Sequence, residues 1–206
     1  MYARAVALVC LLSVSAWVAR AETLHRPGDR VAVYLSHAPI LSPEVSKSML
    51  KEARALMRQL GYRLDWFDSG NQPGEIENGL LTVVDLAGVC NGIQPEDTEQ
   101  QRPVARVLAS TAVSDGEVLP FSSVDCTALH ALMAPRLERV PKRRRNTLFG
   151  RAMGRVLAHE LYHIAAKTRE HSSEGVAKAA FSAADLLADK FEFQREESAQ
   201  LHVAPQ

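Results

Sequence analysis

The sequence predicts an α+β fold with α/β-like features, in which a small mixed β-sheet packs on one long helix and a further helix ends the chain. Two strand patterns, at 31–35 and 62–66, enclose a helical pattern, and this order implies a right-handed crossover with parallel strands. A hairpin pattern around residues 114–116 adds antiparallel pairing. Residues 146–167 carry a strongly helical pattern with a broad apolar stripe, which predicts the long helix.

Composition indicates one globular domain with a substantial core. The chain has 206 residues, of which 47% are hydrophobic and 23% are charged. Basic and acidic side chains number 24 each, so the formal net charge is zero. This balance gives no general electrostatic reason to expect nucleic acid or an acidic membrane as a partner. We expect a single domain over residues 22–206 that acts as a monomer.

The N-terminal residues 1–21 have the features of an export signal. Arg4 supplies a positive charge, residues 5–18 form an apolar run, and Ala19-Arg20-Ala21 fits an A-x-A cleavage site. The run is too short to span a membrane comfortably, and a lipid anchor at Cys10 is disfavoured because valine precedes it. The sequence therefore predicts an exported protein, periplasmic or extracellular, without a stable membrane anchor.

Cysteine usage agrees with export. Cys10 would leave with the signal, and Cys90 and Cys126 would remain as an even pair in an oxidising compartment. We expect these two residues, 36 positions apart, to form a disulfide that contributes about 3 to 4 kcal/mol in the chain-entropy model. The alternative is two buried free thiols, because a cysteine-based zinc site would need more ligands nearby.

The first half of the chain alternates strands with one helix. Residues 31–35 are nearly all apolar, as in a strand covered on both faces. Ser42-Pro43 provides an N-cap and a first-turn proline for a helix that ends before Gly61. Its apolar positions are Val45, Met49, Ala53, Leu56, Met57 and Leu60. Residues 62–66 alternate as a half-buried strand, and residues 80–86 form a third strand.

The middle of the chain is less regular. Residues 88–103 are polar and rich in turn formers, which indicates a surface loop tied down at Cys90. Residues 106–113 and 117–124 flank a glycine-containing turn and predict a β-hairpin. Pro120 lies in the second arm and cannot donate to a strand ladder, so we expect that arm to be an edge strand.

The last third of the chain is predicted to be mainly helical. Residues 127–137 suggest a short helix, and the basic run Lys142–Arg145 is interpreted as the solvated entry to the helix at 146–167. A processing site or an anionic contact at this basic run remains an alternative, since cations sit poorly at a helix N-terminus. A capping-box variant at 182–185 opens a last helix that we expect to reach Gln200.

An HExxH pattern within the predicted long helix contains candidate metal-binding and catalytic residues. His159 and His163 are four residues apart, so a helix places their imidazoles side by side as metal ligands. Glu160 lies on the flank of the same face, where it can activate a water at the metal. A zinc site needs a third protein ligand, and His171 is the candidate by spacing, with Glu192 as its rival. The pattern is short and can arise by accident, but it predicts one zinc ion per chain.

Residues 159–177, HELYHIAAKTREHSSEGVA, resemble secreted bacterial zincin-like proteins, in which HExxH is followed after seven residues by a third histidine and a short turn. More distantly, the stretch is similar to metzincins, whose spacing is shorter. The resemblance implies three histidine ligands, catalysis by Glu160, and an edge strand that aligns an extended peptide over the helix. Two positions depart from the family pattern: Ala177 replaces the methionine of the turn, and Ala166 replaces a glycine at the bend.

Three functions are compatible with these residues. The first is a secreted zinc endopeptidase that acts on protein or peptide substrates, with Glu160 as general base. The second is a zinc-binding domain that recognises peptides or a partner without cutting them. The third is a structural zinc domain or a metal-free domain. No oxyanion-stabilising residue stands out, because Tyr162 is expected to point away from the ligand face.

Overall fold

The computed structural model describes residues 30–36, 41–68, 70–71, 79–92 and 107–202. The predicted export signal, Cys10 and most of the predicted loop at 88–103 lie outside these residues. The elements, in chain order, are β1 (Arg30–Leu35), α1 (Pro43–Gln59), β2 (Arg63–Phe67), β3 (Leu80–Ala87), β4 (Ala109–Ser114), β5 (Glu117–Asp125), α2 (Cys126–Leu137), α3 (Lys142–Ala166), α4 (Ala183–Leu187) and α5 (Arg195–His202).

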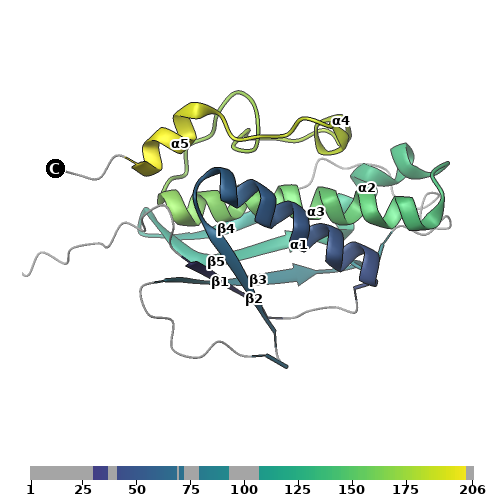
Figure 1. Cartoon of the computed structure of the whole chain (residues 1–206), viewed down its shortest axis with the longest axis horizontal. Helices are drawn as coiled ribbons and strands as arrows, with labels where there is room; N and C mark the ends of the chain where they lie inside the picture. Colours follow the sequence, from purple (N-terminus) through teal and green to yellow (C-terminus); the bar gives the residue numbers. More distant parts are fainter. Residues whose placement is uncertain (1–29, 37–40, 69, 72–78, 93–106, 203–206) are drawn as a thin grey trace, which may run out of the picture.

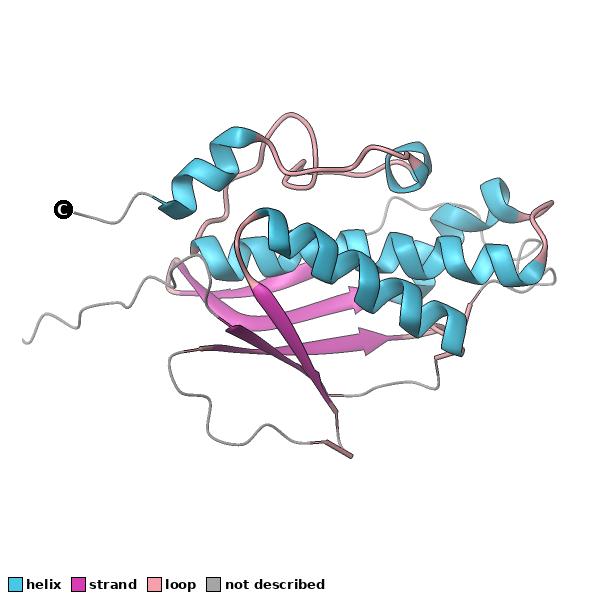
Figure 2. Ribbon diagram, viewed as in Figure 1, coloured by secondary structure: helices cyan, strands magenta, loops and turns pink. Residues whose placement is uncertain are grey.

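The strands form one mixed sheet in the order β2-β1-β3-β5-β4. β1 is parallel to both β2 and β3, β3 is parallel to β5, and β4 closes one edge as the antiparallel partner of β5. Figures 1 and 2 show α1 and α3 covering one face of this sheet. The predicted α+β class, with a small mixed sheet packed on a long helix, is confirmed.

The long helix α3 lies close to α1 because two of its residues lack a side chain. A Cβ on Gly150 would lie 2.3 Å from the carbonyl oxygen of Val45, and one on Gly154 would lie 2.6 Å from that of Met49. On its other side α3 packs against β4 and β5. The helix that carries the histidines is therefore held from two directions at once, and its large apolar side chains Phe149, Met153, Leu157 and Leu161 are fully buried.

Local sequence signals between residues 42 and 126 behave as predicted. The Ser42 hydroxyl accepts from the Val45 N–H and caps α1, and Gly61 follows that helix with a φ of +86°. In the β4–β5 hairpin, Asp115 and Gly116 both have positive φ, as in the turns that match the twist of paired strands. The Cys90–Cys126 disulfide is present and joins the loop after β3 to the first residue of α2.

The prediction that Pro120 places its strand at an edge is wrong. β5 lies inside the sheet, between β3 and β4. Its ladder with β3 begins only at Phe121, and its pairing with β4 shifts register between Thr111 and Val113. Pro120 falls within this irregularity, where no ladder hydrogen bond is required of its nitrogen. Its carbonyl oxygen accepts from the Thr82 hydroxyl at 3.1 Å.

The prediction of one last helix is also wrong. The capping box at Ser182 and Asp185 forms, but α4 ends at Leu187, and the chain runs without regular structure to α5 at Arg195. Tertiary hydrogen bonds compete with the helix there, because the Ala188 carbonyl accepts from Arg155. The Phe193 N–H also donates to Gln59 at the end of α1, so contacts with α3 and α1 shape the region between α4 and α5.

The basic run belongs to α3, which begins at Lys142 rather than at residue 146. Lys142, Arg143 and Arg144 are exposed, as expected of a solvated helix entry, whereas Arg145 is buried and donates to the Glu138 carbonyl. Among the described residues, no helix combines the length and the apolar character needed to cross a bilayer.

Candidate metal centre

Two histidines occupy the end of α3 nearest β4 and are almost completely enclosed. His159 is 6% exposed and His163 is 7% exposed. Their ring centroids are 4.5 Å apart, which is the side-by-side placement that a spacing of four residues on a helix gives. The helix therefore presents both imidazoles together, as the sequence predicts.

The hydrogen bonds of these rings determine which nitrogen is available. His159 Nδ1 lies 2.7 Å from the Val176 carbonyl oxygen, and His163 Nδ1 lies 2.8 Å from that of Thr168. A carbonyl oxygen can only accept, so each Nδ1 carries the proton. In the neutral rings both Nε2 atoms then have a free lone pair. Carbonyl partners of this kind are the usual supports of metal-binding histidines.

The two Nε2 atoms face one another at 3.0 Å. Neutral lone pairs at this distance repel unless a cation lies between them. Burial lowers the pKa of His159 to about 4, against the effect of its bond to Val176, and burial also lowers the pKa of His163. A proton is therefore a poor candidate for that cation. Two nitrogens bound to one zinc ion at about 2.0 to 2.1 Å lie roughly 3 to 3.5 Å apart, so a metal ion fits the pair.

The third histidine reaches the same point after the chain reverses. α3 ends at Ala166, and Lys167 adopts the left-handed conformation with a φ of +50°. The bend therefore uses Lys167, and neither a glycine nor Ala166 provides it. His171 is exposed, with its ring centroid 5.2 Å from that of His159 and 4.9 Å from that of His163. Candidate ligand atoms of His159, His163 and His171 all lie within 4.8 Å of one another.

Residues 171–178, which we call the ligand turn, fold under the histidines. The Ser172 N–H donates to the Ala177 carbonyl oxygen at 2.9 Å. Val176 and Ala177 are fully buried, and the Val176 carbonyl holds His159. The Ala177 side chain, at the position where the resemblance implied a methionine, is buried, and the turn supports the site through its backbone.

Glu160 lies beside the histidines and is 5% exposed. Burial raises the pKa of its carboxyl group to about 7, and the hydrogen bond from Thr111 opposes this increase. Thr111 is on β4, and its hydroxyl donates to Glu160 Oε2 at 2.7 Å. A carboxyl group that titrates near neutral pH suits proton transfer.

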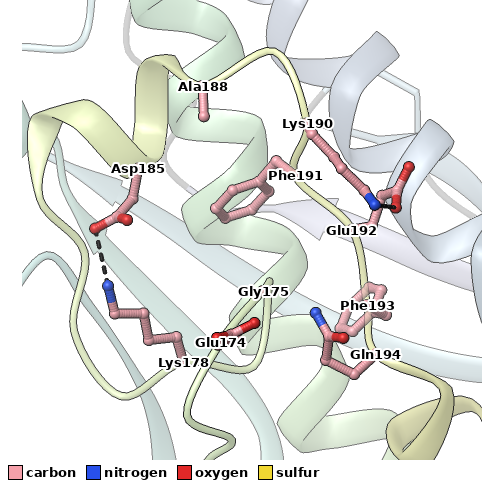
Figure 3. Close-up of a pocket in the computed structure, with 10 residues that line it drawn as sticks. All are labelled: Glu174, Gly175, Lys178, Asp185, Ala188, Lys190, Phe191, Glu192, Phe193 and Gln194. Carbon is pink, nitrogen blue, oxygen red and sulfur yellow. Dashed lines mark hydrogen bonds and ion pairs between the residues drawn. The ribbon is translucent and has the colours of Figure 1, made fainter.

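One pocket of about 350 Å³ collects these groups. Its lining includes the three histidines and Glu160, side chains of β4 and β5, and residues Thr168 and Arg169 of the bend. Glu192, the rival third ligand, lies elsewhere. Its carboxylate is paired with Lys190 at 3.4 Å, and Figure 3 shows both residues beside a different pocket. The structure therefore brings together His159, Glu160, His163 and His171 and leaves Glu192 out.

Several supporting groups were not predicted from the sequence. Thr111 lies on β4 outside any recognisable motif. The carbonyl groups of Thr168 and Val176 belong to the backbone, so no residue type in the sequence points to them. Tyr162 was expected to point away from the ligands; it is buried, and its ring lies against Phe193 as well as His163.

Comparison with known protein families and with curated proteins finds no match. The interpretation of this site therefore rests on its own geometry.

Proposed function

We propose that this chain is an exported zinc-dependent endopeptidase. The observation that carries the proposal is that the Glu160 carboxylate and three histidines line one pocket next to β4, the strand at the edge of the sheet. Zinc fits the donor set because it favours neutral imidazole nitrogens and three protein ligands in catalytic sites. The disulfide Cys90–Cys126 supports an oxidising compartment and hence export.

His159, His163 and His171 would hold the zinc ion, and α3 and the ligand turn fix their placement. Bound zinc lowers the pKa of water and polarises a substrate carbonyl. Glu160 accepts a proton from the attacking water at its carboxylate and passes it to the nitrogen of the leaving amine. Thr111 holds Oε2 of Glu160 by its hydroxyl group, so the carboxylate keeps one orientation through both transfers.

The position of β4 supports a peptide as substrate. The strand pairs only with β5 among the described elements, so the backbone groups along its other side are available. An extended peptide can add to such an edge by main-chain hydrogen bonds. Ala109, Ser110, Thr111 and Val113 of this strand line the histidine pocket. A peptide along β4 would therefore pass close to Glu160.

Replacing Glu160 with glutamine tests the proposal. Glu160→Gln keeps the size of the side chain and a hydrogen-bond acceptor for Thr111 but cannot take up a proton. We expect zinc content and thermal stability close to those of the wild type, with peptidase activity on denatured proteins at least about 100-fold lower. Glu170→Gln is the matched control, since Glu170 is exposed and lies between the second and third histidines.

A different result would favour recognition without cleavage. If the wild type binds one zinc ion but cleaves nothing across a diverse pool of denatured proteins, the peptidase proposal fails. If Glu160→Gln then binds peptides as tightly as the wild type, the chain is a zinc-containing peptide-recognition domain.

A further inference from the structure

His171 is held differently from the other two histidines. His159 and His163 are enclosed on α3, and a backbone carbonyl orients each ring. His171 is exposed and lies outside regular secondary structure. Its ring packs against the other two rings, so it touches the groups that it would join in binding a metal. The placement of His171 therefore depends on the backbone of the ligand turn.

The ligand turn is attached to residues 188–202, which we call the C-terminal segment. The Val176 N–H donates to the Glu192 carbonyl oxygen at 3.1 Å. Gly175 has a φ of +72°, and a Cβ there would lie 2.4 Å from the same oxygen, so the two backbones touch. Figure 3 shows Gly175 facing the stretch that contains Phe193 and Gln194. The backbone of the ligand turn therefore packs directly against the C-terminal segment.

A second link connects the C-terminal segment to the residue next to His171. The Ser172 hydroxyl donates to one carboxylate oxygen of Glu197, and the Gln194 N–H donates to the other. Glu197 belongs to α5 and is only 2% exposed. A buried carboxylate needs such donors, so Ser172 and Glu197 hold one another in place. The backbone at Ser172 is thus fixed from α5 and, through its own N–H, from Ala177.

We propose that Glu197 is a positioning residue for the third metal ligand. The Ser172–Glu197 hydrogen bond holds the ligand turn so that His171 meets His159 and His163, and the affinity for zinc therefore depends on the docking of α5. This inference rests on the proposed zinc site. It concerns how tightly the ion is held and is independent of whether the chain cleaves peptides.

Coupling of this kind works in both directions. If docking of the C-terminal segment favours zinc binding, bound zinc must favour docking by the same factor. The amide of Val176 reports on docking, because it donates to the Glu192 carbonyl oxygen of this segment. We expect hydrogen exchange at this amide to slow when zinc is added to the full chain.

Ser172→Ala tests the link with the smallest change. It removes the hydroxyl donor and leaves the bond between Gln194 and Glu197 in place. Loss of a residue that supports a metal ligand typically weakens metal binding about 10- to 100-fold, and we expect the Kd for zinc to rise within that range in competition with a chelator. Ser173→Ala is the control, because Ser173 is exposed in the same turn. Ser172→Thr keeps the hydroxyl group and should restore most of the affinity.

The outcomes separate this inference from the proposed function. A wild type that binds no zinc overturns the proposed zinc site itself. A wild type that binds zinc while Ser172→Ala keeps its Kd within about twofold overturns only the role of Glu197, even if the metal-free variant melts earlier. Should Ser172→Ala fail to fold, Glu197→Gln against Glu196→Gln repeats the comparison, with weaker zinc binding expected for the first alone.

Discussion

Two successive turns of α3 bury ionisable side chains in opposite ways. Arg155 is 2% exposed, and the protein surrounds it with acceptors. Its Nε donates to Glu52 at 2.7 Å, one terminal nitrogen donates to the carbonyl groups of Asp185, Leu186 and Ala188, and its guanidinium lies 4.6 Å from the centre of the Phe191 ring. His159, one turn further on, and His163, two turns further on, direct two free lone pairs at one another.

This difference distinguishes a buried charge that stabilises the fold from side chains that are arranged to bind a ligand. Burial lowers the pKa of Arg155, and Glu52 opposes that change by accepting a hydrogen bond, so the cost of burying the cation is offset within the protein. For the histidines, the described part of the chain supplies a backbone carbonyl at each Nδ1 and no group of opposite charge at Nε2. Polar groups that converge without a complementary partner need one from outside. We infer that Arg155 serves the fold and that the histidines serve a metal.

The largest effect that this comparison predicts is on stability at Arg155. Arg155→Leu would remove the donor to Glu52 and to the carbonyl groups of Leu186 and Ala188, while the Asp185 carbonyl keeps the Ala188 N–H. Breaking a buried ion pair from one side typically costs about 3 to 5 kcal/mol. We expect a loss of that size in urea unfolding of the metal-free protein. Arg144→Leu, exposed on the same helix, should change the free energy of unfolding by less than about 0.5 kcal/mol. Equal losses for the two variants would contradict the structural role of Arg155.

The next effect is on metal binding at His171. His171→Ala removes a ligand and should raise the Kd for zinc by more than about 100-fold, beyond the effect of losing a supporting residue. Because His171 is exposed, the unfolding free energy of the metal-free protein should barely change. Glu192→Ala should keep the wild-type Kd, and the opposite ranking would make Glu192 the third ligand.

A smaller effect concerns the support of Glu160. Thr111→Val removes the hydroxyl group while keeping the shape of the side chain. A hydrogen bond to a charged group contributes about 1.5 to 3 kcal/mol, so we expect kcat to fall about tenfold or more with unchanged zinc content. Thr111→Ser should recover most of the activity. Wild-type kcat in the valine variant would show that Thr111 has no part in holding the carboxylate.

The smallest expected effect is the pH dependence of the unfolding free energy that the capping box of α4 contributes. Carbonyl groups in and just after this helix accept from Arg155. Hydrogen bonds from Ser182 lower the pKa of Asp185 below its ordinary value of 3.8, with help from Lys178. A lowered pKa stabilises the fold above the ordinary value, and this stabilisation is lost as the pH falls through the folded-state pKa. Asp185→Asn should therefore cost about 1 kcal/mol at pH 7, as helix caps do, and progressively less below pH ~4. A difference that stays constant down to pH 2 would contradict this assignment.

Local signals account for the parts of the fold that the sequence predicted. The spacing of His159 and His163, the Ser42 cap and the turn at Gly116 each depend on neighbouring residues alone. Thr111 contacts Glu160 across 49 residues, and only the strand order brings β4 over α3.

Long-range contacts explain the features that were missed or wrongly predicted. The helix predicted from residue 182 to Gln200 breaks because Arg155 takes the Ala188 carbonyl and the Phe193 N–H donates to Gln59. Pro120 was assigned to an edge because a sequence does not show where a sheet changes register. Arg155 itself carried no local signal of its role. Predictions that concern export, the 22–206 domain and a monomeric state stay predictions.

We propose that three histidines of this chain hold one zinc ion beside Glu160. X-ray absorption at the zinc edge, on purified protein reconstituted with zinc, measures the metal content and its ligands together. We predict one zinc ion per chain with three imidazole nitrogens at about 2.0 to 2.1 Å, and the same spectrum for Glu160→Gln. Absence of stoichiometric zinc, or coordination by fewer than three imidazoles, would contradict the proposed zinc site.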